Sequence, residues 1–86
     1  MPRVSQFYGI TIAMYFKDHA PPHFHAYYGG QNALIEIDTG ALVRGSLPDR
    51  ALRLVREWAA LHVEELHSNW DLAQREGELQ RIEGLR

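Results

Sequence analysis

The sequence predicts an α+β fold in which an antiparallel sheet of about five strands packs against one long C-terminal helix. Two patterns lead to this prediction. Residues 1–47 contain short apolar segments separated by glycine-containing turns, whereas residues 48–76 repeat apolar side chains with the period of an α-helix. A chain of 86 residues has room for one hydrophobic core. We therefore expect a single domain over residues 1–86, in which residues 77–86 form a tail or a short strand.

The composition, with 45% hydrophobic and 23% charged residues, is that of a soluble globular protein. No apolar segment approaches the roughly 20 residues of a membrane helix, so we expect no membrane partner. The absence of cysteine excludes disulfides and thiolate metal sites and agrees with a cytoplasmic location. A net charge of −2 argues against a general electrostatic binder of nucleic acid. Any phosphate-binding surface must therefore be local.

Five segments of the N-terminal half are predicted to be strands. The clearest is Ile10–Phe16, in which larger apolar side chains alternate with the others, as in a half-buried strand. The other four predicted strands are Val4–Phe7, His23–Tyr28, Ala33–Asp38 and Ala41–Ser46. The short turns between them predict antiparallel hairpins.

Residues 48–76 are predicted to form one helix. At 100° per residue, the apolar side chains gather on a face centred on Trp58. This stripe keeps its phase across Ser68 and Asn69, where the sequence allows a bend. Gly77 follows the stripe and is expected to cap the C-terminal end of the helix.

The segment Asp18–Ala26, which reads D-H-A-P-P-H-F-H-A, is the strongest candidate for a functional site. Its prolines deliver the chain in an extended form into the third predicted strand. On that strand His23 and His25 share a face, with Cα atoms about 7 Å apart. His19 can fold back towards them from the preceding loop. Because Phe24 suits the side that faces the helix, we expect both strand histidines to face away from it.

Three interpretations of this histidine cluster remain open at the level of sequence. His19, His23 and His25 could bind a divalent metal such as zinc and leave one coordination position open. Without a metal, the same histidines could act as general acid and base on a phosphodiester. In the third interpretation they belong to an exposed strand face and stack on tyrosines. The candidate binding residues beside them are Tyr15, Asp18 and Tyr27.

A second polar group interrupts the apolar face of the predicted helix. His62, Glu65 and Asn69 fall within the apolar sector, where a buried polar group needs a hydrogen-bond partner. We expect these three residues to form a structural network that fixes the helix on the sheet. The alternative is that this face meets a partner.

The chain resembles a family of small bacterial domains of unknown function. The motifs that carry the resemblance are F-Y-G-I, M-Y-F, D-H-x-P-P-H-F-H-A, L-P, E-W, H-x-x-E-L and N-W, which here begin at Phe7, Met14, Asp18, Leu47, Glu57, His62 and Asn69. Such proteins look like members of two-gene modules of the toxin–antitoxin type. The resemblance therefore implies a protein partner encoded by a neighbouring gene and a bacterial cytoplasmic location.

Together these patterns lead us to expect a component of a toxin–antitoxin-like module whose histidine cluster is an active or recognition surface that acts on RNA. Two alternatives belong to other classes: a non-catalytic interaction or regulatory module, and a metal-binding hydrolase of unknown substrate. The sequence is also compatible with a homo-oligomer, and it requires no cofactor other than the metal of the last alternative.

Overall fold

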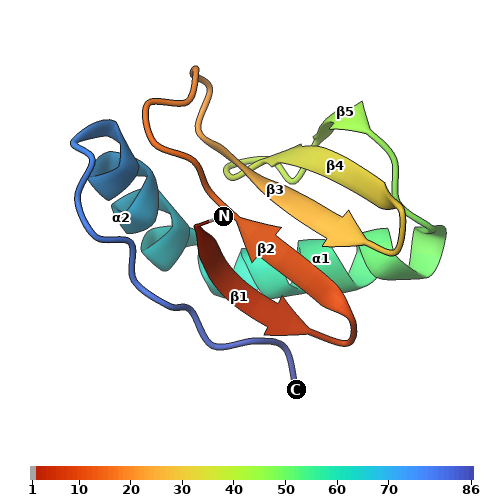
Figure 1. Ribbon diagram of the computed structural model, residues 1–86. Helices are drawn as coiled ribbons and strands as arrows, with labels where there is room; N and C mark the ends of the chain where they lie inside the picture. Colours follow the sequence, from red (N-terminus) through yellow and green to blue (C-terminus); the bar gives the residue numbers. More distant parts are fainter. Residues whose placement is uncertain (1) are drawn as a thin grey trace.

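The computed structural model describes residues 2–86. Its elements follow in the order β1 (Arg3–Phe7), β2 (Ile10–Ala13), β3 (His23–Tyr28), β4 (Gln31–Glu36), β5 (Leu42–Gly45), α1 (Asp49–Leu61) and α2 (Val63–Gln74). The strands form one antiparallel sheet in which each strand pairs with the next along the chain (Figure 1). The predicted α+β class and the five-stranded antiparallel sheet are thus confirmed.

The tight turns of the sheet are set by backbone conformations that favour glycine. Tyr8 and Gly9 both have positive φ, at +50° and +79°, as in the two-residue turns that match the twist of a hairpin. Gly45 ends β5 with φ of +80°, and a Cβ atom there would lie 2.2 Å from the carbonyl oxygen of Asn32. Only glycine allows β5 to approach β4 this closely.

The single long helix expected over residues 48–76 is wrong, because two helices occupy this region. They meet at His62, whose φ of −128° ends the first helix, rather than bending at Ser68 and Asn69. A straight helix over residues 49–74 would be about 39 Å long, whereas the longest dimension of the domain is 33 Å. The break allows the apolar residues of both helices to reach the same core. In Figure 1, α1 packs along one face of the sheet, while α2 lies beyond its end.

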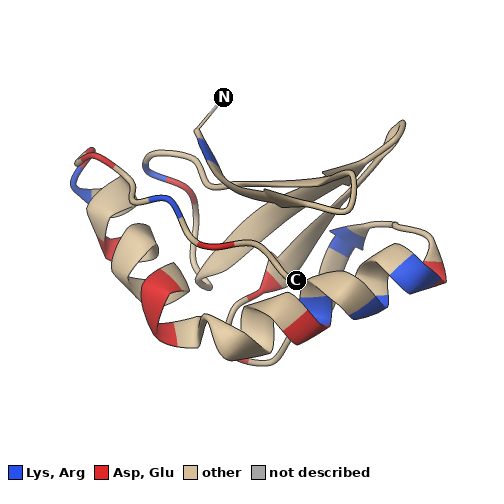
Figure 2. Cartoon of the chain, turned by 90° about the horizontal axis from the view of Figure 1, so that it is seen from below, with Lys and Arg blue, Asp and Glu red and all other residues tan. Residues whose placement is uncertain are grey.

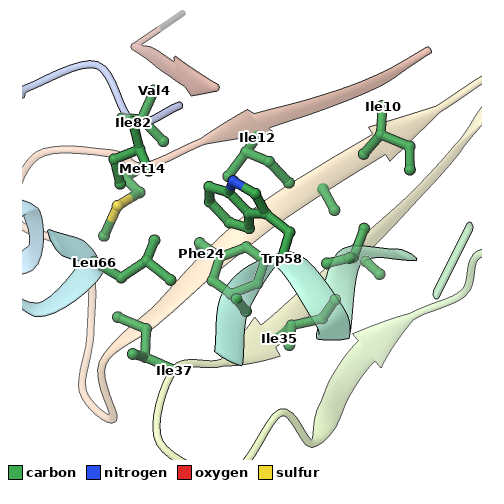
Figure 3. Close-up of a cluster of buried hydrophobic side chains, with 14 of the residues drawn as sticks. Val4, Ile10, Ile12, Met14, Phe24, Ile35, Ile37, Trp58, Leu66 and Ile82 are labelled. Carbon is green, nitrogen blue, oxygen red and sulfur yellow. The ribbon is translucent and has the colours of Figure 1, made fainter. Parts of the chain in front are cut away.

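Trp58 of α1 is at the centre of the hydrophobic core and is fully buried (Figure 3). Its ring lies 5.4 Å from that of Phe7 and 5.7 Å from that of Phe24, measured between centroids. The indole Nε1–H donates a hydrogen bond of 2.8 Å to the carbonyl oxygen of Glu83. The side chain expected at the centre of the apolar face therefore also holds the C-terminal segment.

The C-terminal segment contains no strand and instead clamps the two helices to β1. Ile82 is buried, and its backbone N–H donates to the carbonyl oxygen of Val4 at 2.7 Å. In Figure 1 this segment leaves α2 and returns alongside β1, so it covers that edge of the sheet. The opposite edge, strand β5, has four exposed residues.

The residue that caps the C-terminal end of α2 lies one position before the expected one. Glu76, with φ of +56°, takes the left-handed conformation that we expected at Gly77. The N–H of Gly77 donates to the carbonyl oxygen of Leu72 at 2.8 Å, and that of Glu76 donates to Ala73 at 3.2 Å. This pair of bonds is the Schellman pattern.

The helices differ in charge (Figure 2). α1 carries both signs, whereas α2 contains Glu64, Glu65 and Asp71 and no lysine or arginine. No helix within residues 2–86 is both long enough and apolar enough to cross a membrane.

Candidate functional site

The loop between β2 and β3 is held by the C-terminal end of α2. Strand β2 ends at Ala13, three residues before the predicted end, and Lys17 reverses the chain with φ of +59°. The N–H of Lys17 donates to the carbonyl oxygen of Ala73 at 3.2 Å, and Gln74 Nε2 donates to the carbonyl oxygen of Asp18 at 3.2 Å. These bonds place Asp18 beside the start of β3.

The Asp18 carboxylate joins the two histidines of β3. Its Oδ2 atom lies 2.9 Å from Nε2 of His23 and 3.1 Å from Nε2 of His25. Its Oδ1 atom accepts a hydrogen bond of 2.9 Å from the backbone N–H of His19. We call Asp18, His23 and His25 the Asp–His–His cluster.

His23 is the most buried member of this cluster, with 4% of its surface exposed. Its Nδ1 lies 2.8 Å from the carbonyl oxygen of Pro21. Because a carbonyl oxygen can only accept, Nδ1 must carry a proton. The ring is thereby fixed with Nε2 directed at Asp18. Trp70 of α2 packs on the same ring, at 5.2 Å between centroids.

His25 is half-buried and borders a pair of tyrosines. The Tyr15 ring meets the His25 ring edge-on, with centroids 4.7 Å apart. The hydroxyl groups of Tyr15 and Tyr27 share a hydrogen bond of 2.6 Å. Burial, followed by the hydrogen bond with Tyr27, raises the pKa of Tyr15 to about 12. The Tyr15 phenol is therefore neutral at physiological pH.

Asp18 is ionised at neutral pH. Partial burial raises the pKa of its carboxyl group, but hydrogen bonds from His25 and the His19 N–H, together with the neighbouring His23, outweigh that effect. The net pKa is lower than the ordinary value of 3.8. The cluster therefore presents a carboxylate, which can only accept, to two ring nitrogens.

The predicted three-histidine set differs from the observed cluster in one member. His23 and His25 lie together, with ring centroids 5.3 Å apart. His19 is exposed, and its contribution to the cluster is its backbone N–H. The turn at Lys17 directs Asp18 rather than His19 towards β3, so a carboxylate takes the place expected for the third imidazole.

The expectation that both strand histidines face away from the helical part of the molecule is wrong for His23. The break between the helices turns α2 around the end of the sheet, where Trp70 covers His23. A single straight helix would not reach this side. Sequence reasoning missed Trp70 and Gln74, because only the tertiary fold brings them to the cluster, and it also missed the local contact of His23 with the Pro21 carbonyl.

A small pocket of about 180 Å³ adjoins the cluster on the side of β4 and β5. Its lining combines the ends of the loop with apolar and cationic side chains, namely Asp18, His19, Ala20, Pro21, His23, Leu34, Val43 and Arg44. Among residues 2–86 no carboxylate lies within ion-pair distance of Arg44. The pocket therefore provides an unpaired positive charge beside the cluster.

The polar group predicted on the helix, His62, Glu65 and Asn69, forms two separate interactions in the structure. His62 Nδ1 and Glu65 Oε1 lie 2.5 Å apart, and the Glu65 side chain is 53% exposed. Asn69 is buried and bonds the backbone of Gln80 twice, at 2.8 Å each, once as donor and once as acceptor. The expected three-residue network is not formed, because the break at His62 leaves Glu65 outside the apolar face.

The fold and the site define a class: an antiparallel α+β domain with a carboxylate and two histidines at the end of its sheet. Residues 9–71 match the family described as "Domain of unknown function (DUF4160)", and the chain belongs to this family. The expected membership of a family of small domains of unknown function is thereby confirmed. No curated protein and no solved structure matched the chain.

Proposed function

We propose that this protein is the RNA-directed component of a two-gene, toxin–antitoxin-like module and that the Asp–His–His cluster is its active surface. The observation that carries the proposal is the position of the Asp18 carboxylate, 2.9 Å and 3.1 Å from the Nε2 atoms of His23 and His25. Hydrolysis of a phosphodiester requires activation of an oxygen nucleophile and compensation of negative charge. Two imidazoles held by an ionised carboxylate are groups of the type that this chemistry uses.

The charge distribution supports an approach of RNA from the side of β4 and β5. Because the segment Val63–Gln74 carries acidic side chains and no basic ones, it repels a polyanion (Figure 2). Arg44 lines the pocket beside Asp18 and His23 and has no ionic partner among residues 2–86. An arginine there suits a phosphate group, which its planar guanidinium can bind through two hydrogen bonds.

A specific observation also favours the second candidate function, a non-catalytic module that binds a protein partner. Among the described residues 2–86, strand β5 pairs only with β4, and its Leu42 and Val43 side chains are 38% and 54% exposed. An edge strand with exposed apolar side chains can accept a further strand from another chain. In a two-gene module, both properties can coexist: β5 would bind the product of the neighbouring gene, while the cluster acts on RNA.

Expression of the protein in bacteria, with and without the product of the neighbouring gene, tests the proposal. We expect wild-type protein to slow growth and to cleave RNA, and His25→Gln to remove both effects while its circular dichroism and partner capture remain unchanged. His67→Gln, a histidine variant outside the cluster, should behave as wild type. If His25→Gln stays fully active and only Val43→Lys or Tyr27→Ala changes behaviour, by loss of partner capture, the interaction module is correct.

A further inference from the structure

We infer that Asp18, His23 and His25 form a binding site for one divalent transition metal ion of the zinc type. The inference concerns the same surface as the proposed function and would supply its cofactor, but it can be tested without RNA. Each of the three residues offers one potential ligand atom, and these atoms all lie within 4.8 Å of one another. Within residues 2–86 this is the one group of three or more histidine and acidic residues so arranged.

His23 directs the lone pair of its Nε2 atom at Asp18. The hydrogen bond to Pro21 places the proton of a neutral ring on Nδ1, so that Nε2 is an acceptor. That acceptor faces another acceptor, Asp18 Oδ2, at 2.9 Å. Two lone pairs repel at this distance, so the arrangement is stabilised by a cation between them, either a proton on Nε2 or a metal ion. A metal ion at this place would bind Nε2 and Oδ2 together, while Nδ1 keeps its hydrogen bond to Pro21.

His25 converges on the same oxygen atom of Asp18. His25 Nε2 lies 3.1 Å from Asp18 Oδ2, so two ring nitrogens and one carboxylate oxygen point at a common region. One proton can bridge one pair of atoms, but a metal ion binds all three. A histidine ligand usually donates its other ring N–H to a backbone carbonyl or carboxylate, as His23 does to Pro21.

The distances within the cluster are close to those of a metal site. Bonds of 2.0–2.1 Å in a tetrahedral arrangement place ligand atoms about 3.3 Å apart. The two separations from Asp18 Oδ2, 2.9 Å and 3.1 Å, must open by a few tenths of an ångström, and the separation between the two histidine nitrogens, which is at most 4.8 Å, must become about 3.3 Å as well. Both histidines belong to β3, and Asp18 is held through its Oδ1 and its carbonyl oxygen. The ligands are therefore held close to the required arrangement before the ion binds.

The ligand types select the class of metal. Imidazole nitrogen suits zinc and its transition-metal neighbours, whereas calcium and magnesium require sets of oxygen ligands. Three protein ligands leave a position for water or substrate, which is the arrangement of catalytic sites. In the described part of the chain, residues 2–86, two further histidine–carboxylate pairs occur, His62 with Glu65 and His67 with Asp38, and neither has a third ligand there.

Isothermal titration of tag-free, EDTA-treated protein with Zn²⁺ tests the inference. We expect binding of one ion per chain and a higher melting temperature, with no response to Mg²⁺ or Ca²⁺. Asp18→Asn and His25→Gln should each weaken Zn²⁺ binding by at least about 10-fold. His19→Gln and His67→Gln should bind as wild type. Circular dichroism establishes that each variant is folded, and the visible spectrum of the Co²⁺-loaded protein gives a second measure of coordination by the cluster.

The inference is overturned if Zn²⁺ and Co²⁺ do not bind, if binding survives in both Asp18→Asn and His25→Gln, or if it depends on His19 instead. These results are distinct from failure of the proposed function. Zn²⁺ binding by the cluster without RNA cleavage would support the metal site and reject the RNA-directed function. RNA cleavage that persists in EDTA, by a protein that does not bind Zn²⁺, would support that function and reject the metal site.

Discussion

The indole ring of Trp70 lies against the imidazole ring of His23, with 5.2 Å between centroids and 55° between the ring planes. Trp70 belongs to α2 and His23 to β3, so the helix that follows the break at His62 covers one side of the cluster. Asp18 and Pro21 hold His23 through its two ring nitrogens. The packing of α2 and the geometry of the site therefore depend on each other.

Replacement of Trp70 by alanine is expected to lower the free energy of unfolding by about 3–5 kcal/mol, because the buried indole leaves a cavity next to His23. Urea denaturation measures this change. Trp70→Phe keeps an aromatic ring in the position and should cost less than half as much. Unchanged stability of Trp70→Ala would show that α2 does not pack on β3.

Asn69 is expected to stabilise the C-terminal clamp. Asn69→Ala leaves the N–H and the carbonyl group of Gln80 without their partners, so it should cost about 1–3 kcal/mol. Hydrogen exchange should show faster exchange of the Ile82 amide, which bonds Val4. Glu65→Gln is the matched control, since Glu65 is exposed and should change stability by less than about 0.5 kcal/mol. Equal effects of the two substitutions would contradict the assignment.

Tyr15 should titrate with a pKa of about 12, two units above its ordinary value of 10.0. A raised pKa in the folded state means that the fold favours the neutral phenol. The corresponding stability is fully present below pH 10 and is lost as the pH rises through 12. Absorbance titration of the tyrosines should contain this late step, and Tyr15→Phe should remove it. A wild-type titration without a step above pH 11 would contradict the burial of Tyr15 beside Tyr27.

The hydrophobic pattern predicted most of the sheet, because side-chain alternation and glycine turns are local properties. Strand β3 has the predicted bounds, His23–Tyr28. The helix break was not predictable in the same way. The apolar stripe around Trp58 continues in phase through residues 50–76, and only the limited size of the core requires the chain to turn at His62.

The sequence predicted only part of the site, because only some of its contacts follow from a local pattern. The spacing of His23 and His25 on one strand brings them together irrespective of the surrounding loop. Whether His19 or Asp18 becomes the third member of the cluster depends on the turn at Lys17. It also depends on two hydrogen bonds between the loop and the end of α2, at Ala73 and Gln74. These contacts join residues more than 50 positions apart, so no local pattern indicates them.

The most direct test of the functional account is the rate of RNA cleavage by purified Asp18→Asn compared with Asp38→Asn. Both substitutions remove a carboxylate that contacts a histidine, since Asp38 Oδ1 lies 2.6 Å from His67 Nε2, but Asp38 is outside the cluster. We predict that Asp18→Asn lowers the rate on the order of 10²-fold or more, while Asp38→Asn keeps the wild-type rate. Absence of cleavage by the wild-type protein, or equal rates for Asp18→Asn and wild type, would contradict the account.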